Sequence, residues 1–464
     1  NGLLTVSGTA SAGTDVILTS QQGLTLSGAV VAAGDALLSA VGALTVADTG
    51  SIVAGQAVTL DAGGPITIAG SLQAGTTAAL DTVQSIAVTA SGSVRAAGTA
   101  TLAAGTTLDV AGTVDAGGSA SLGAGDFLSV GGTVQADAAA TLTSGGGINV
   151  WGTVRAGTDA SLTSGTWMIV DGTVQAAGSA SLAAGAWLDL GGAVVAGLDA
   201  TLDAGADLRV LSGGLVRSAG SASLTAATFL VHEGVVDADG NATLTAGQWM
   251  WLAGNLVAGG DASVTAGTEL HVLGLVAVAG EAALEAGTDL RAFAGAQVLS
   301  NGPVTLTATQ SLLVEGMIET GADATLTSGQ TTTVAAGGAV RAAGAATLVA
   351  GSTLAIDGAV AAGAGVGLTA GAALSLSAGG SVTSGADATL AAPGPILVGG
   401  ELRADGSVIL DTPSGISVPG TIGAGANAAL SAGQAIAVAG MIEAGGAATL
   451  VAGSTLTIDG AVAA

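Results

Sequence analysis

The chain has 464 residues with no cysteine and no tyrosine, and its seven arginines, its lack of lysine and its 33 acidic residues give a formal net charge of −26. The lack of cysteine excludes disulfides and thiolate metal sites, and the acidic charge disfavours nucleic-acid binding, because affinity for phosphate depends on cationic contacts. Apolar residues are 49% of the chain, but they alternate with Ala, Gly, Ser and Thr, so no transmembrane segment is predicted.

In chain order, residues 1–7 supply one strand, LLTV, of a partial coil, and complete coils run from Gly8 to Asp459. They number about 22 at a repeat of ~20 residues, and GAVAA at 460–464 begins another partial coil. No linker or change of composition divides the chain, so one continuous domain is predicted over 1–464. Because the chain starts at Asn1 without Met, we expect a mature or excised segment.

The stretch from Gly92 to Ser212 shows the repeat most clearly. Three apolar columns recur every 20 residues: Val94, Val114, Val134, Val154, Val174 and Val194; Leu102, Leu122, Leu142, Leu162, Leu182 and Leu202; and Leu108, Leu128, Ile148, Met168, Leu188 and Leu208. Self-similarity at a fixed period of this length is typical of a repeat architecture.

Within each repeat the apolar residues recur at every second position, which predicts three short strands, such as TVRA, ASLT and MIV between 153 and 170. Glycine corners separate them at Gly152, Gly157 and Gly165, and we expect these corners to need positive φ. A strand this short cannot bury its apolar face alone, so each should pair in parallel with its equivalent one repeat away. The predicted fold is all-β, a single-stranded parallel β-helix with three sides.

The units of the form GxVxAGxxASLxAGxxLxV, as at Gly172–Leu190 and Gly440–Ile458, resemble the repeats of filamentous haemagglutinin and its relatives. These are exoproteins of two-partner secretion in Gram-negative bacteria. The resemblance covers nearly the whole chain, although Gly/Ala-rich coils also occur in autotransporter passengers. It implies a right-handed helix and a secreted adhesin rod, located outside the cell or on its outer surface.

An aromatic and apolar stripe departs from the repeat and is the predicted interaction site. Its members are Phe127, Trp151, Trp167, Ile169, Trp187, Phe229, Trp249 and Trp251. Most of these rings come just before a buried residue of the third strand, so the alternation points them outward. Three interpretations compete: lateral packing against another rod, a sugar-stacking adhesive site, or rings that lie over corner glycines without a partner.

Acidic residues recur after the first corner: Asp15, Asp35, Asp159, Asp199, Asp261, Glu281, Asp323 and Asp387. The main interpretation is that their side-chain oxygens cap turns. Calcium bridging at Asp15/Asp35 or Asp261/Glu281 is a weaker possibility, and no other cofactor or metal is predicted.

The remaining polar residues of note are interpreted as structural, with His232 at a position that is apolar in other coils and His271 on the outer face. A Ser/Thr ladder that includes Thr141 and Thr143 raises an ice-binding hypothesis, but Thr is also simply a good strand residue. His232 and His271 are interpreted as structural, and Arg95, Arg155 and Arg403 as members of a polar ladder that pairs with acids one coil away.

The predicted function is therefore structural: a secreted rod that mediates adhesion or filament assembly by stacking or lateral packing. The alternative is a glycan-binding adhesin module that uses the tryptophan stripe, and ice binding is the least favoured. The predicted partners are other copies of the chain or a glycan or protein on a host or neighbouring cell. No coil carries the long loops that an enzymatic cleft would need, so no catalytic residue is predicted.

Overall fold

The computed structural model describes residues 2–464, and Asn1, at the start of the predicted partial coil, lies outside the described residues. The chain forms two compact units: one runs to Ala227 and includes Gly234–Ala238, and the other comprises Thr228–Glu233 and Asp239–Ala464. Each unit is a parallel β-solenoid with about 20 residues per turn, which confirms the predicted fold class. That 1–464 forms one continuous solenoid stays a prediction.

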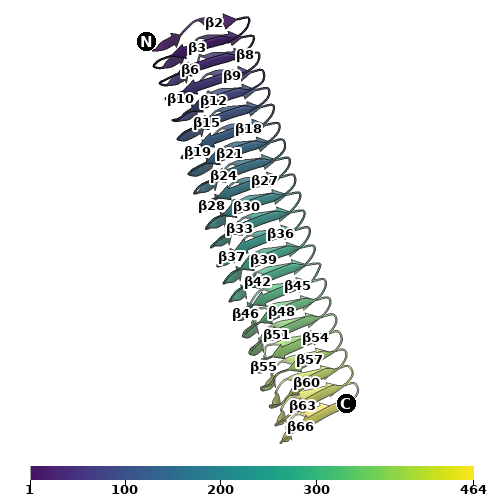
Figure 1. Ribbon diagram of the computed structural model, residues 1–464. Helices are drawn as coiled ribbons and strands as arrows, with labels where there is room; N and C mark the ends of the chain where they lie inside the picture. The colour runs from purple at the N-terminus through teal and green to yellow at the C-terminus, as the bar shows by residue number, and fades with distance from the viewer. Residues whose placement is uncertain (1) are drawn as a thin grey trace. The chain divides into compact units, whose positions relative to one another are not determined.

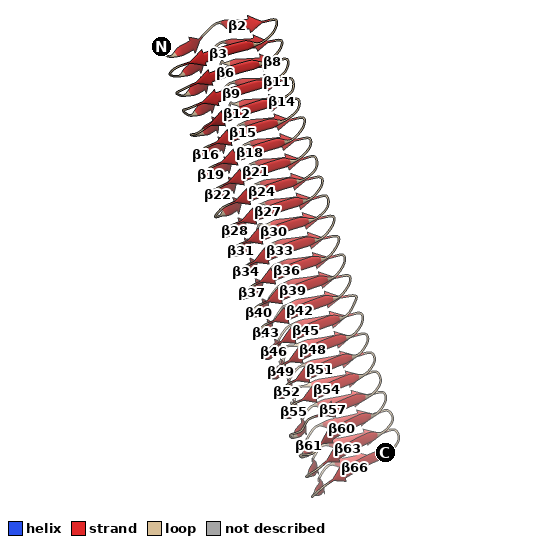
Figure 2. Cartoon of the chain, in the orientation of Figure 1, coloured by secondary structure: helices blue, strands red, loops and turns tan. Residues whose placement is uncertain are grey.

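A single coil consists of three strands joined by short corners, as predicted. In the coil that begins at Gly152 they are β23 (Thr153–Ala156), β24 (Ala160–Ser164) and β25 (Met168–Val170). Equivalent strands stack into three parallel sheets, here named sheet A for the β25 side, sheet B for the β23 side and sheet C for the β24 side. Every regular element of the described residues is a strand, as the red arrows of Figure 2 show.

The strands of the first unit are short and regularly spaced. Those of sheet A are β1 (Leu4–Val6), β4 (Leu24–Leu26), β7 (Leu44–Val46), β10 (Ile66–Ile68), β13 (Ile86–Val88), β16 (Thr107–Val110), β19 (Phe127–Val130), β22 (Gly147–Val150), β25, β28 (Leu188–Leu190) and β31 (Leu208–Val210). Those of sheet B are β2 (Thr9–Ala12), β5 (Ala29–Ala32), β8 (Ser51–Ala54), β11 (Ser71–Ala74), β14 (Ser93–Ala96), β17 (Thr113–Ala116), β20 (Thr133–Ala136), β23, β26 (Thr173–Ala176), β29 (Ala193–Ala196), β32 (Leu215–Ser218) and β35 (Val235–Ala238). Those of sheet C are β3 (Val16–Ser20), β6 (Ala36–Ala40), β9 (Val58–Ala62), β12 (Ala78–Thr82), β15 (Ala100–Ala104), β18 (Ala120–Ala124), β21 (Ala140–Ser144), β24, β27 (Ala180–Ala184), β30 (Ala200–Ala204) and β33 (Ala222–Ala226).

The second unit repeats this arrangement. Its sheet A strands are β34 (Leu230–His232), β37 (Met250–Leu252), β40 (Leu270–Val272), β43 (Leu290–Ala292), β46 (Ser311–Val314), β49 (Thr331–Val334), β52 (Thr353–Ile356), β55 (Ala373–Leu376), β58 (Ile396–Val398), β61 (Ile416–Val418), β64 (Ile436–Val438) and β67 (Leu456–Ile458). Its sheet B strands are β38 (Asn255–Ala258), β41 (Leu275–Val278), β44 (Gln297–Ser300), β47 (Met317–Thr320), β50 (Ala339–Ala342), β53 (Ala359–Ala362), β56 (Ser381–Ser384), β59 (Glu401–Ala404), β62 (Thr421–Ala424), β65 (Met441–Ala444) and β68 (Ala461–Ala463). Its sheet C strands are β36 (Ala242–Ala246), β39 (Ala262–Ala266), β42 (Ala282–Ala286), β45 (Val304–Ala308), β48 (Ala324–Ser328), β51 (Ala346–Ala350), β54 (Val366–Ala370), β57 (Ala388–Ala391), β60 (Val408–Thr412), β63 (Ala428–Ala432) and β66 (Ala448–Ala452).

The predicted apolar columns are confirmed as the core. Leu162 pairs in register with Leu142 on one side and Leu182 on the other, and all three are fully buried. Successive side chains of a strand point to opposite faces, so the polar partners of the alternation face outward. Figure 1 shows the parallel strands of neighbouring coils lying side by side within each unit. Like residues therefore stack on like residues in a narrow interior.

The corner glycines are present as predicted, but the expected reason for them is wrong. Among residues 2–464 the only positive φ is that of Gly295, at 91°. A methyl group on Gly152 would instead overlap the carbonyl oxygen of Gly132 one coil away, and one on Gly165 would overlap that of Gly145. Glycine is required at these corners because stacked backbones leave no room for a side chain.

None of the described residues belongs to a helix that is long and apolar enough to cross a membrane.

Candidate functional site

In the first unit, three rings of the predicted stripe form a column on sheet A. The rings of Trp167 and Trp187 are stacked, with centroids 5.5 Å apart and planes 11° from parallel. Trp167 also covers Gly147, whose missing side chain makes room for the indole, and its centroid lies 5.7 Å from that of Phe127. All three side chains are half-buried. Gly147 belongs to strand β22 rather than to a corner, and the three interpretations of the stripe all remain open.

In the second unit, the predicted rings fall into two contacts. Phe229 and Trp249 stack with centroids 4.8 Å apart. Trp251 lies edge-on to His271 at 5.5 Å, and both contact Phe293, at 6.1 and 5.3 Å. All five of these side chains are half-buried, although they lie on the outer face.

Two members of the stripe lie outside these ring contacts. Trp151 is 63% exposed and has no ring partner among residues 2–464. Ile169 is half-buried between Asn149 and Asp189 in the register of sheet A.

Burial raises the pKa of the Asp189 carboxyl, and the nearby Arg209 guanidinium opposes this in part.

The ring geometry limits what the stripe can bind. The planes of Trp167 and Trp187 are nearly parallel, so each ring covers one face of the other. A sugar stacks on the face of a ring, so this mutual stacking removes one face of each indole from such binding. The apolar surface that remains is also of the kind that packs against another protein.

A cluster on sheet A of the second unit was not predicted. Arg291 makes a bidentate ion pair with Glu315, with Nη2 2.9 Å from each carboxylate oxygen, and its guanidinium lies 4.1 Å from the centroid of Phe293. His271 Nε2 also lies 3.6 Å from Glu269 Oε2. The 20-residue spacing of Trp251, His271 and Arg291 was the available signal, because it places all three in one outward column.

Outward apolar residues near the start of the chain were also missed. Ile17 and Leu37 are paired in sheet C and are 66% and 37% exposed, and Val31 and Val53 are paired in sheet B and are 41% and 38% exposed. Polar residues hold the equivalent positions in most later coils, and this contrast was readable from the alignment of the repeats.

The aspartates of the acidic column cap the next coil rather than their own turn, whereas the Glu281 side chain makes no such bond among the described residues. Asp159 Oδ1 accepts a hydrogen bond of 2.8 Å from the backbone N–H of Ser179, which is the equivalent residue one coil later. The same bond is made by Asp15, Asp35, Asp199, Asp261, Asp323 and Asp387, and by Asn241 and Asn427, which were not predicted. One oxygen of each side chain is thus used within the fold, and calcium bridging at Asp15/Asp35 or Asp261/Glu281 stays a prediction.

Each of these side chains needs space in the next coil. A methyl group on Gly178 would overlap Asp159 Oδ1, and the glycines that follow the other capping residues by one coil are blocked in the same way: Gly34, Gly220, Gly260, Gly280, Gly344, Gly406 and Gly446. Asp35 is the exception, since Gln56 takes the place of the glycine.

We therefore expect Gly178→Ala to destabilise the protein by about 2 kcal/mol, because the added methyl displaces the Asp159 carboxylate from its bond. In an Asp159→Ala background, which itself loses about 1 kcal/mol with the hydrogen bond, the same change should cost much less. Chemical denaturation of the four proteins of this double-mutant cycle measures the difference. Equal costs of Gly178→Ala in both backgrounds would contradict the pairing.

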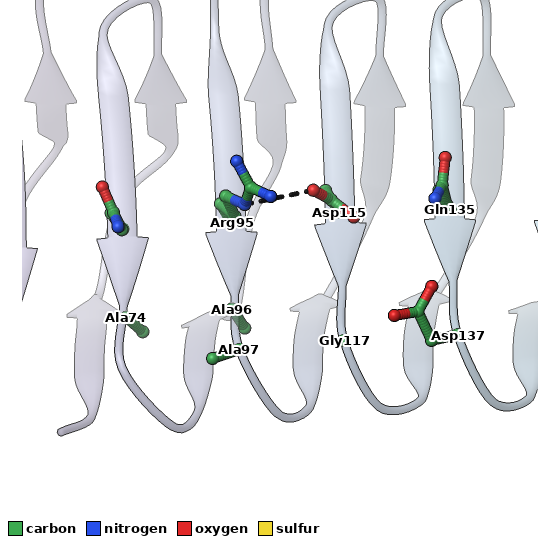
Figure 3. Close-up of a pocket in the computed structure, with 9 residues that line it drawn as sticks. Ala74, Arg95, Ala96, Ala97, Asp115, Gly117, Gln135 and Asp137 are labelled. Carbon is green, nitrogen blue, oxygen red and sulfur yellow. Dashed lines mark ion pairs between the residues drawn. The ribbon is translucent and has the colours of Figure 1, made fainter.

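A row of polar side chains follows sheet B in the first unit. Arg95, Asp115, Gln135, Arg155 and Gln175 occupy the same outward position on β14, β17, β20, β23 and β26, and these five residues are named the sheet-B polar row. Arg95 Nε lies 3.2 Å from Asp115 Oδ2, which confirms the predicted pairing one coil away. This ion pair is the dashed line in Figure 3. Shallow depressions of about 250 and 190 Å³ lie along the row.

The other two arginines of the predicted ladder behave differently. Arg403 pairs with Glu401 on its own strand. Arg155 makes no ion pair with any of the residues that the structure describes, and its neighbours in the row are the amides of Gln135 and Gln175.

His232 replaces an apolar residue in the core of the second unit. It is fully buried, and its Nε2 lies 3.0 Å from the carbonyl oxygen of Asn255, so Nε2 carries the proton and donates it. Nδ1 has no partner among residues 2–464. Burial lowers the pKa of this histidine from its usual 6.5, opposed in part by the bond to Asn255, so the folded state holds His232 neutral.

Acidification should therefore destabilise the coils around His232. As the pH falls below 6.5, His232 binds a proton in the unfolded chain but stays neutral in the folded chain. The free energy of unfolding is therefore highest above pH 6.5 and decreases as the pH falls from 6.5 to the lowered pKa of the folded state. We expect His232→Leu to reduce the loss of stability between pH 7 and pH 5, measured by hydrogen exchange of β34 and β37, while the control His271→Gln does not. An unchanged pH dependence in His232→Leu would contradict this role.

The described residues include no cluster of three or more His, Asp or Glu side chains placed to hold a metal ion.

Comparison with known proteins agrees with this architecture. The family model described as Haemagglutinin repeat matches residues 1–28, 31–95, 217–274, 277–341, 330–392, 370–417 and 397–462. Residues 96–216 carry the same three-strand coils. Searches of curated proteins and of solved structures found no match. The family model covers well over half of the sequence, and the chain belongs to the haemagglutinin repeat family as a filamentous haemagglutinin-like repeat region.

Proposed function

We propose that the chain is a structural segment of a secreted bacterial adhesin, exposed on the outer surface of a Gram-negative cell, that assembles laterally with other copies. Membership of the haemagglutinin repeat family implies a secreted or surface protein and fits an adhesin-like rod without enzymatic activity. The observation that carries the proposal is the unbroken register of each sheet within each unit: like strands pair one coil after another, with corners too short to form a cleft.

The mechanism of such a segment is mechanical. Every coil bonds to the next through three parallel ladders, and the Asp and Asn caps add a bond at one corner in many coils. A pull along the stack is therefore shared among several hydrogen bonds per coil. The sheet surfaces remain available for contacts with neighbours.

In this proposal, neighbouring copies contact each other through the aromatic stripe. The rings of Phe127, Trp167 and Trp187 form an apolar strip, and aromatic residues are enriched at the centres of protein interfaces. Within the chain the rings pack against each other, so a partner would cover edges that are already held in place, at little cost in side-chain entropy.

The test is the double variant Trp167→Ser/Trp187→Ser. It should abolish bundles seen by negative-stain microscopy and leave the circular dichroism spectrum unchanged, because the replaced rings lie outside the core. Leu198→Ser is the matched control, since Leu198 is 57% exposed and lies outside the stripe. Bundles that persist in the double variant, or that are lost in the control, count against lateral packing by the stripe.

A glycan-binding role is the second candidate, and Trp151 favours it. Its ring is the exposed one of the stripe and has no ring partner in residues 2–464, so a face is available for a sugar. Under this alternative, Trp151→Ser should lose binding on a glycan array while Trp167→Ser/Trp187→Ser retains it. Loss of bundling together with retained glycan binding would separate the two functions.

A further inference from the structure

The sheet-B polar row has a charge order that is complementary to itself. In chain order it reads Arg95, Asp115, Gln135, Arg155 and Gln175, one residue per coil and all in register. Figure 3 shows Arg95, Asp115 and Gln135 on the same face of neighbouring strands. Neighbouring strands of a sheet lie about 4.8 Å apart, so the row is a line of evenly spaced polar groups.

We propose that this row is a docking surface for a second copy of the chain, in an antiparallel face-to-face pair with Gln135 at the two-fold axis. This two-fold axis lies in the interface and runs parallel to β20. It places β17 of one copy opposite β23 of the other, and β14 opposite β26. Asp115 then faces Arg155 of the second copy, and the symmetry makes this contact twice. Arg95 faces Gln175, and Gln135 faces Gln135.

Three nearby positions of the axis bring like charges together. An axis along β17 places Asp115 on Asp115, and one along β23 places Arg155 on Arg155 and Asp115 on Val195. An axis midway between β17 and β20 places Arg95 on Arg155. An axis midway between β14 and β17 joins Arg95 to Asp115 of the second copy, but it leaves Arg155 opposite Val53. Within the row, the axis along β20 is the one that places a carboxylate opposite Arg155.

The charge of the whole chain makes this surface unusual. With a net charge of −26, most faces of two copies repel each other. Here Arg95 and Arg155 balance Asp115 and the neighbouring Asp137, and Arg155 has no acidic partner of its own in the described residues. Asp137 follows β20 at an exposed corner, so it stays at the solvated rim of the contact. Pairing supplies Arg155 with a carboxylate.

The contact is expected to be weak. Five short strands per copy put it in the small class of interfaces, below about 1,200 Å² of buried surface. Exposed charge pairs are also screened by salt. The pair should therefore form at low ionic strength and dissociate as salt is added. It uses sheet B, so it is independent of the aromatic stripe, which lies on sheet A.

Charge variants test the pairing by complementation. Arg155→Asp alone places Asp on Asp115 of the second copy, and Asp115→Arg alone places Arg on Arg155, so each should weaken self-association by about tenfold or more. An equal mixture of the two variants restores opposite charges at both contacts and should recover the dimer in analytical ultracentrifugation. Arg341→Asp, a change of the same charge in the same outward column of the second unit, is the matched control and should leave the dimer unchanged.

Crosslinking tests the register directly, because the chain has no cysteine of its own. Gln135→Cys should be joined to its copy by a short bismaleimide at low salt. Gln175→Cys should not, since two such residues lie about 19 Å apart across the axis at 4.8 Å per strand. A mixture that stays monomeric, a wild-type chain that stays monomeric at low salt, or equal crosslinking of the two cysteine variants would overturn the proposal.

Discussion

Replacing Leu162 with Asp should lower the stability of its coils by about 3 kcal/mol or more, because the carboxylate would be buried without a partner. Leu162 is fully buried and stacks in register between Leu142 and Leu182. The residues stacked directly on either side are leucines, which cannot form an ion pair with the carboxylate. Thermal unfolding followed by circular dichroism measures the loss, and hydrogen exchange of β21, β24 and β27 locates it.

The matched control is Thr163→Asp on the same strand. Thr163 is exposed and faces outward between Thr143 and Ala183, so the same carboxylate there stays in water. We expect a change within about 0.5 kcal/mol, as for most surface substitutions. Wild-type stability of Leu162→Asp, or equal losses in the two variants, would refute the assignment of the inner and outer faces.

Gly132→Ala is expected to cost about 3 kcal/mol, although it adds a single methyl group. That methyl would overlap the carbonyl oxygen of Gly112 in the preceding coil. The atom in the way belongs to the backbone of a hydrogen-bonded ladder, so it cannot move aside without opening the pairing of β17 with β20. Chemical denaturation, with hydrogen exchange to locate the opening, measures the cost.

The adjacent Gly131 provides the control. A methyl group built on Gly131 has no other atom within 4 Å, and its φ is not positive, so Gly131→Ala should be neutral or slightly stabilising. Two neighbouring glycines of one corner are thus expected to respond in opposite ways. If both variants lost stability equally, a conformational requirement rather than crowding would explain this corner.

The fold could be predicted from the sequence because its signal is repeated in every coil. The positions of Val154, Leu162 and Met168 are apolar in the neighbouring coils at the same spacing, so local alternation and stacking favour the same register. The structure confirmed the three strands per coil, their parallel pairing and the buried columns.

The reason for the glycines could not be read from one coil. A glycine at a corner is usually interpreted as a conformational requirement, whereas glycine is needed at 152 because the backbone of the preceding coil lies too close for a side chain. The target of Asp159 was missed for a similar reason, because its partner is Ser179 and not its own turn. Both features depend on contacts between coils, which local sequence patterns do not describe.

The candidate site was predicted less completely than the fold. Alternation placed Trp167 and Trp187 on the outer face, but it gave no information on how their rings orient. The orientation of Trp167 depends on Gly147, because the indole occupies the space that a side chain at 147 would fill and thereby contacts Phe127. The cluster of His271, Arg291 and Phe293 was missed because it forms between neighbouring coils, and His271 by itself was interpreted only as a structural residue.

The pairing of a capping residue with a glycine in the following coil also limits how such a chain can change its length in evolution. Removing residues 160–179, one full repeat, would preserve the number of strands per coil and the alternation of every column. It would also bring Leu198 to the place of Gly178, beside the carboxylate of Asp159. Recombination between repeats is therefore tolerated at some junctions and penalised at others, although the repeats on both sides of each junction fold alike.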